Sequence, residues 1–575
     1  MNRRKEVGVV ALGVVVAMFS AFPPFAHSAT GPALPTARPA VENISPPGVM
    51  NNLQLVGSNP LIDPVLSIPR GMNAGLAIAG NCAFVGSRNG FQDTLVLDIS
   101  SPASPTLVGS LPHIPGATAR ELKALDDLNT LVVENFRRGG DSGVLGIPKG
   151  SIVQNALQIY QVPSPCTSIS SANLKATLAL EDKPHEFFLW RDPQSPNRIL
   201  AYVSYWSPIF TGRTGTVDIR VYDLTGIAQG PSLGTLDASL FRKAEFSLTA
   251  LGIPSTVSVP STFAGASTGA QPPFAFDQTI HSMSVSVDGT RVFASAYNFG
   301  FFEIDSTPLA QQASCNPTSP TTTSPTGHCL TKLNLDPLAR YNYHPPFESG
   351  THSALKIPGR PYVYLVDEDE PGACPWAWVR ILSAEPAPMA ALDTGSLSPA
   401  MFPTQFGAFA LPENNVENCS ANVAKFSQDG VGTFAAPLVT FSSHNPLVFP
   451  NLVIESFWSG GLRVVSIDNP SLPLEAGYFF PAPPRNERFC FDDTPNGCFK
   501  LKTQPIIQQR PKTIPEILMW SYPTLKDGLV YVVDVNSGLF VLKYTGPGAD
   551  QLPTKGICTS DAIQNPGFAP CPPFQ

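Results

Sequence analysis

Short apolar runs, broken by turn residues, recur along the whole chain. The clearest pair runs from Met283 to Val287, turns through Asp288 to Arg291 and returns from Val292 to Ala296. An Asp-Gly turn between two alternating apolar runs is a strong signal for a β-hairpin. The pattern therefore predicts many short antiparallel strands joined by turn-rich loops.

One of these strands repeats. The sequence LVLDISSP, from Leu95 to Pro102, recurs with substitutions as LRVVSIDNP, from Leu462 to Pro470. Weaker copies of the same strand are Phe301–Asp305, Ile219–Asp223 and Gly538–Leu542. Following the hairpin and its next strand along the chain predicts seven units, whose inner strands start near Asn73, Arg120, His185, His281, His352, His444 and Pro515. Their spacing is uneven because insertions such as the Ser/Thr/Pro-rich stretch from Asn316 to Gly327 map to surface loops in repeat proteins.

A closed ring of such units predicts an all-β fold, a single β-propeller of seven blades. A four-stranded blade cannot bury both faces alone, and ring closure gives each face a neighbour. We expect the propeller to span residues 61–548, with an N-terminal extension at 29–60 and a C-terminal tail at 549–575. Two stacked β-sandwich domains remain the alternative, although no Pro/Gly linker divides the chain cleanly.

The repeated strand also resembles a known family. The stretch from Leu95 to Ser110, LVLDISSPASPTLVGS, looks like the LVIVD repeat of secreted bacterial β-propellers, and Gly460 to Gly477 looks like a second copy. In that second copy Ser466 stands where the repeat has an aspartate. The resemblance implies the propeller fold and implies little about activity.

Composition excludes several classes of function. Sixty-one prolines and 45 glycines are too many for long helices, whereas 43% hydrophobic residues suffice for a large core. A formal charge of −8 with only 14% charged residues argues against a nucleic-acid partner, which requires concentrated Lys and Arg.

The first residues resemble an export signal. A basic cluster, Arg3, Arg4 and Lys5, precedes an apolar run from Val7 to Phe22, which is too short for a confident membrane span. We expect a signal peptide at residues 1–28 and a secreted or periplasmic protein with no membrane span after signal cleavage.

Ten cysteines follow that segment, and none forms a Cys-x-x-Cys motif. An even number in an exported chain favours disulfides over metal or redox thiols. Three pairs are close enough in sequence to form disulfides that close local loops: Cys315 with Cys329, Cys490 with Cys498, and Cys558 with Cys571.

Four of the eight histidines share one place in the repeat, where an inner strand begins: His185, His281, His352 and His444. Inner strands of a propeller line its central channel, so residues at their starts converge on one mouth. Imidazole is a common ligand for transition metals, and an all-histidine shell would suit iron or copper. The methanethiol oxidase (selenium-binding) family and the carotenoid oxygenases hold a metal with axial histidines, and this chain is similar to them in that placement only.

The second strand of an antiparallel blade ends where the first strand began, at the same mouth of the central channel. Five acidic residues lie near second-strand ends and are expected there: Glu134, Asp367, Glu368, Glu455 and Asp534. They could accept the second ring N–H of a metal-bound histidine, or form a solvated rim. Aromatic residues at Tyr205, Trp206, Tyr297, Phe457 and Trp458 could wall a substrate pocket or pack between blades.

Two functions follow from these observations. The first is a metal-dependent oxidoreductase acting on a small molecule, with the four histidines as metal ligands. The second is a non-catalytic scaffold that binds a surface-exposed protein or glycan through its loops, with the histidines bonded to the backbone of neighbouring blades.

Overall fold

A computed structural model of the chain describes residues 48–62, 70–90, 92–136, 154–205, 217–249, 280–297, 300–311, 333–334, 336–341, 350–368, 377–384, 405–414, 441–481, 517–565 and 571. All of these ranges belong to one compact unit, Val41–Gln575. The predicted signal peptide lies outside the described residues, and the domain limits remain predictions.

The described residues form six sheets, which confirms the all-β prediction. The largest has nine strands: β3 (Asn73–Ala79), β4 (Cys82–Ser87), β5 (Thr94–Asp98), β6 (Thr106–Leu111), β7 (Thr118–Leu125), β8 (Thr130–Phe136), β9 (Ala156–Gln161), β10 (Leu174–Ala179) and β14 (Gly234–Asp237). A single residue pair, Ser87 with Ala119, joins its β3–β6 part to its β7–β14 part.

Each of the other five sheets has four or five strands. The next is β11 (Pro184–Arg191), β12 (Ile199–Tyr205), β13 (Ile219–Asp223), β15 (Arg242–Phe246) and β19 (Leu333–Asn334). It is followed by β16 (Ile280–Val285), β17 (Arg291–Ala296), β18 (Gly300–Asp305) and β20 (Asp336–Tyr341), and then by β21 (Gly350–Lys356), β22 (Tyr362–Glu368), β23 (Val379–Ser383) and β24 (Gln405–Phe409).

The last two sheets each include a strand from the start of the described chain. One contains β25 (Pro446–Val448), β26 (Leu452–Ser456), β27 (Leu462–Ser466), β28 (Leu474–Pro481) and β1 (Gly48–Asn51). The other contains β29 (Thr524–Lys526), β30 (Leu529–Asp534), β31 (Gly538–Tyr544), β2 (Leu53–Asn59) and β32 (Ile557–Cys558). Residues expected in an N-terminal extension therefore form the outer strands of two sheets.

The repeat seen in the sequence corresponds to one position in these sheets. The five copies of the LVLDI-like strand are β5, β13, β18, β27 and β31, and each is the third of its unit counted from the inner strand. The predicted Asp-Gly hairpin is β16 and β17, which confirms that turn, although β16 begins three residues earlier, at Ile280. The last inner strand, β29, begins at Thr524 rather than near Pro515.

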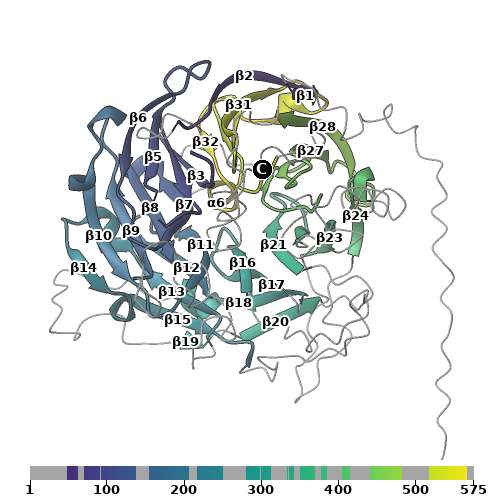
Figure 1. The fold of residues 1–575 in the computed structure, drawn as a ribbon. Coiled ribbons are helices and arrows are strands. Elements are labelled where there is room, and N and C mark those ends of the chain that lie inside the picture. The colour runs from purple at the N-terminus through teal and green to yellow at the C-terminus, as the bar shows by residue number, and fades with distance from the viewer. Residues whose placement is uncertain are drawn as a thin grey trace, which may run out of the picture. The chain divides into compact units, whose positions relative to one another are not determined.

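Inner strands of successive units lie beside one another around a short helix. Strands β11, β16, β21 and β25 are neighbours in that order, and all four contact helix α6 (Ser560–Gln564). Figure 1 shows α6 among the inner strands. Two other short helices, α2 (Thr225–Gln229) and α3 (Thr307–Ala310), follow β13 and β18. This arrangement is of the β-propeller type.

Among the described residues, no helix is long and apolar enough to cross a membrane.

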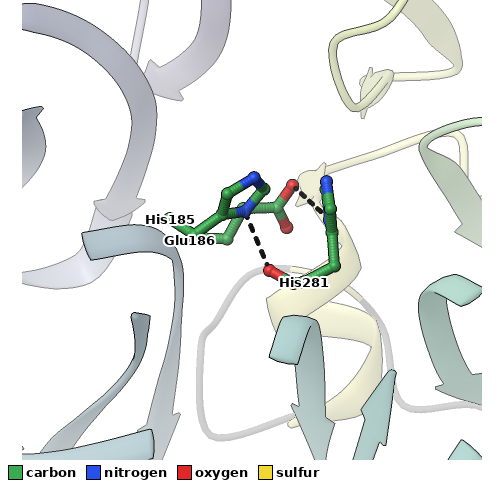
Figure 2. Close-up of side chains that lie close together, drawn as sticks. All are labelled: His185, Glu186 and His281. Atoms are coloured by element: carbon green, nitrogen blue, oxygen red, sulfur yellow. Dashed lines mark hydrogen bonds and ion pairs between the residues drawn. The ribbon is translucent and has the colours of Figure 1, made fainter. Parts of the chain in front are cut away.

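A register irregularity recurs where inner strands begin. In β16 the pairing jumps between Ile280 and Ser282, and in β21 between Thr351 and Ser353, so His281 and His352 are each an extra residue opposite the second strand. In β11 two residues, His185 and Glu186, stand opposite one. A bulge of this kind bends the strand and re-aims the extra side chain. Figure 2 shows the result, with His185 and Glu186 turned toward His281.

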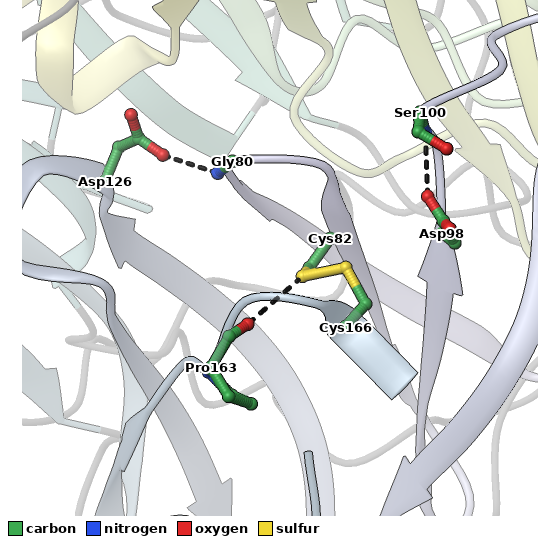
Figure 3. Close-up of a disulfide and its surroundings, with 7 residues drawn as sticks. All are labelled: Gly80, Cys82, Asp98, Ser100, Asp126, Pro163 and Cys166. Carbon is green, nitrogen blue, oxygen red and sulfur yellow. Dashed lines mark hydrogen bonds between the residues drawn. A yellow bond between two sulfur atoms is a disulfide. The ribbon is translucent and has the colours of Figure 1, made fainter. Parts of the chain in front are cut away.

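Two disulfides lie within the described residues. Cys558–Cys571 confirms one predicted local pair. Cys82–Cys166, which joins β4 to the segment after β9, spans 84 residues and was not predicted (Figure 3). The predicted pairs Cys315–Cys329 and Cys490–Cys498 lie outside the described residues. Disulfides are consistent with an extracellular protein.

The pairing of β2 with β31 generates a first prediction, at Gly538. This glycine has φ +106°, and a Cβ there would collide with the carbonyl oxygen of Asn59 in β2. Gly80 also has a positive φ, +55°, but nothing lies within 4 Å of its Cβ position. We expect Gly80→Ala to cost about 1–2 kcal/mol of unfolding free energy for its backbone alone, and Gly538→Ala to cost about 1–3 kcal/mol more. Denaturant midpoints check this, and equal losses would contradict the close approach of β2.

The two disulfides generate a second prediction. In the chain-entropy treatment, closing an 84-residue loop stabilises the folded state by about 4–5 kcal/mol and closing a 13-residue loop by about 3 kcal/mol. We therefore expect the double variant Cys82→Ala/Cys166→Ala to lower the melting temperature more than Cys558→Ala/Cys571→Ala does. Thermal unfolding of both variants tests this. The reverse order would show that Cys558–Cys571 stabilises the fold more than its loop length predicts.

Candidate metal centre

The four strand-start histidines lie together. Ring centroids are 3.8 Å apart for His185 and His281, 3.8 Å for His281 and His352, and 3.9 Å for His352 and His444. All four side chains are buried, with at most 5% of any residue exposed. The bulges of β11, β16 and β21 explain why His185, His281 and His352 gather, because each bulge turns an extra residue to the same side. His444 lies two residues before β25, whose pairing with β26 is regular.

Three of the four imidazoles are fixed through Nδ1. His185 Nδ1 lies 3.0 Å from the carbonyl oxygen of His281, and His444 Nδ1 lies 2.6 Å from the carbonyl oxygen of Trp520. His352 Nδ1 lies 2.7 Å from the hydroxyl of Ser353. An Nδ1–H that donates to a carbonyl leaves Nε2 with its lone pair, which is the usual state of a metal-binding imidazole.

Two carboxylates complete the cluster. Glu186 Oε1 lies 3.6 Å from His281 Nδ1 and 3.9 Å from His352 Nε2. Glu368 reaches three histidines, with its oxygens 3.5 Å from His281 Nε2, 3.8 Å from His352 Nε2 and 3.1 Å from His444 Nε2. Figure 2 shows Glu186 between His185 and His281. Glu368 was predicted to lie near the histidines, whereas Glu186 was missed although it follows His185 directly in the sequence.

Burial sets the protonation state of these groups. It lowers the pKa of His281, His352 and His444 well below the usual range, and neighbouring histidines lower the pKa of His281 and His352 further. The imidazoles of His281, His352 and His444 are therefore neutral, the form that binds metal. Burial also raises the pKa of Glu186 well above its usual range, with a further rise from the charge of Glu121.

The other predicted acidic residues have different surroundings. Asp367 pairs with Arg380 Nε at 2.9 Å, and Asp534 accepts the backbone N–H of Leu518 at 2.6 Å. Glu455 accepts the hydroxyl of Tyr364 at 2.6 Å, and burial raises its pKa to about 8.

Glu134, the remaining predicted acid, is fully buried beside the cluster. Both of its oxygens lack a hydrogen-bond partner within the described part of the chain. Burial raises its pKa well above the usual range, and the charge of Glu121 raises it further. In the register of the sheet, Glu134 stands opposite the bulge that contains Arg120 and Glu121.

Aromatic residues surround the histidines. Tyr297 stacks on His281 at 5.5 Å, and Trp458 meets His444 edge-on at 5.3 Å. Trp520, which no pattern in the sequence indicated, lies 5.6 Å from His444. Of the other predicted aromatic residues, Tyr205 bonds to the hydroxyl of Tyr222, Phe457 packs in a separate apolar cluster, and Trp206 lies outside the described residues.

Two groups of donor atoms, which share His281, have the spacing of a metal site. His185, Glu186 and His281 each offer an atom within 4.8 Å of the others, and so do His281, His352 and Glu368. Within the described part of the chain, His281 Nδ1, His352 Nε2 and His444 Nε2 are buried without a hydrogen-bond partner. Buried polar atoms without a partner are uncommon and point to an additional ligand.

Comparison with known proteins supports the fold more than the site. The family model described as LVIVD repeat matches residues 70–112, which cover strands β3–β6. Comparison with curated proteins gives no match. Among solved structures, the crystal structure of the computationally designed Ika8 protein aligns over 85% of this chain and 99% of its own, with a TM-score of 0.37 and 9% identity, a likeness too low to carry an argument. The second repeat copy and the similarity to the methanethiol oxidase family remain predictions.

Proposed function

We propose that this protein is an exported β-propeller that binds one transition-metal ion through His185, His281, His352 and His444. Glu186 and Glu368 complete the proposed binding site. One observation carries the proposal: four buried imidazoles from four successive units converge, and a ring nitrogen of each of His281, His352 and His444 has no hydrogen-bond partner within the described chain.

Charge balance around the cluster also favours a cation. The electrostatically linked buried acids are Glu121, Glu134, Glu186 and Asp561, and the basic groups linked to them are Arg88, Arg120 and Lys123. Without such an ion, burial drives several of these carboxyls toward their protonated form.

The donor set favours iron or copper among the possible ions. Imidazole suits iron, copper, nickel and zinc, whereas calcium and magnesium prefer oxygen ligands. A bound iron or copper ion would supply redox chemistry for a small-molecule substrate. The chain's own groups would orient the imidazoles through Nδ1, and Tyr297 and Trp458 would wall the site against water.

We also infer that the sheets form a single propeller of seven blades. The nine-stranded sheet divides naturally at the single Ser87–Ala119 pair into two blades, because each part has its own inner strand, β3 or β7. The ring would close where β3 meets β29 and β30, and the outer strands β1 and β2 would fasten that closure.

A third prediction tests the metal directly. We expect the purified protein, reloaded with Fe(II) or Cu(II), to bind about one ion per chain, and His281→Ala and His352→Ala to weaken binding at least about 100-fold, beyond the 10–100-fold typical of outer-shell changes. The ring is held by blade packing, so both variants should keep the wild-type circular dichroism spectrum. Elemental analysis and chelator competition measure the effect.

His113→Ala is the matched control, because His113 pairs with Asp93 at 2.7 Å far from the cluster and should leave metal binding unchanged. Wild-type protein that takes up neither ion would overturn the proposal. The non-catalytic scaffold, binding a protein or glycan through its loops, would then be the better account.

A further inference from the structure

Helix α6 occupies the centre of the sheets. All five of its residues are buried, and it contacts strands β11, β16, β21, β25 and β32, which come from different sheets. Figure 2 shows the helix just behind the side chains of Glu186 and His281. The Cys558–Cys571 disulfide spans the helix and closes a loop around it.

Polar side chains of this helix bond to several inner strands. Asp561 accepts Lys123 Nζ at 2.9 Å from β7 and the backbone N–H of Leu189 at 2.9 Å from β11. Ser560 donates to the carbonyl of Pro446 at 2.8 Å, and Gln564 donates to the carbonyl of Lys356 at 2.7 Å. The helix is therefore an integral part of the centre rather than a peripheral tail.

A chain of contacts leads from Asp561 to the candidate metal centre. Lys123 Nζ lies 4.5 Å from the centroid of the Tyr522 ring, which is a cation–π distance. The hydroxyl of Tyr522 lies 3.4 Å from Glu186 Oε2 and 3.3 Å from Ser353 Oγ. Ser353 Oγ in turn contacts His352 Nδ1 at 2.7 Å. A small cavity beside the helix is lined by Lys123, Tyr522 and Asp561 together with Glu121.

His352 depends on this chain more than its neighbours do. His185 and His444 are oriented by rigid backbone carbonyls, whereas the partner of His352 is a hydroxyl that can rotate. Of the groups around Ser353 Oγ, the Ser282 hydroxyl already donates to the carbonyl of His352 at 2.6 Å, and Asn445 is more distant at 3.5 Å. Tyr522 is thus the group best placed to fix that hydroxyl.

We propose that the C-terminal helix holds two metal ligands, Glu186 and His352, in place through Lys123 and Tyr522, with Asp561 and Tyr522 as positioning residues. The proposal rests on the proposed metal function and adds a role for a segment outside the repeat. Asp561 keeps the ammonium of Lys123 against the aromatic face, and the aromatic ring presents its hydroxyl to both ligands. Groups that orient metal ligands commonly change affinity when they are removed.

The experiment compares three variants loaded with Cu(II). Tyr522→Phe removes only the hydroxyl, and Asp561→Asn removes the charge while keeping an oxygen for the N–H of Leu189. Gln564→Ala is the control, because it removes a hydrogen bond of the same helix away from this path. Chelator competition measures affinity, and electron paramagnetic resonance of the bound ion reports the ligand geometry.

We expect Tyr522→Phe to weaken copper binding about 10–100-fold and to change the resonance spectrum. Asp561→Asn should change the spectrum in the same direction, and Gln564→Ala should match the wild type. Wild-type affinity and spectrum in Tyr522→Phe would overturn the positioning role, and that variant decides the matter if Asp561→Asn does not fold. Wild-type protein that binds no metal would instead overturn the proposed function, so the two failures are distinguishable.

Discussion

The recurrent bulge at the start of β11, β16 and β21 is the constraint on which most of the site depends. A regular strand alternates its side chains between two faces, so neighbouring residues cannot both point toward the same centre. An extra residue breaks that alternation, and in β16 and β21 the extra residue is a histidine. In β7 the same irregularity contains Arg120 and Glu121. The same kind of bulge therefore positions both imidazoles and charged side chains.

Buried charge is the second feature that unites the centre. Glu134 and Glu186 are acids that burial keeps near their protonated form, and Lys123 pairs with Asp561 in a largely buried ion pair. Gathering such groups without a compensating ligand costs stability, since isolated buried charges are strongly disfavoured. A divalent ion among the imidazoles would offset that cost, which links the proposed function to the stability of the fold.

The sequence predicts the repeat well because each copy of the third strand has a local apolar pattern. The sequence also indicates the four histidines as a group, since they occupy the same place in successive repeat units. The partners that distant segments contribute are not predictable in this way. Glu186 follows His185 but shows its role only through the bulge, and Tyr522 approaches it from a segment 336 residues away. The Cys82–Cys166 bridge likewise joins parts of the chain whose proximity only the sheet register reveals.

X-ray absorption at the metal edge of the iron- or copper-loaded protein tests the central claim most directly. The account predicts several imidazole nitrogens and at least one oxygen at about 2.0–2.2 Å from the ion, with the imidazole signal reduced in His352→Ala. An ion surrounded by oxygen alone, or an imidazole signal that is undiminished after replacement of His352, would contradict the account.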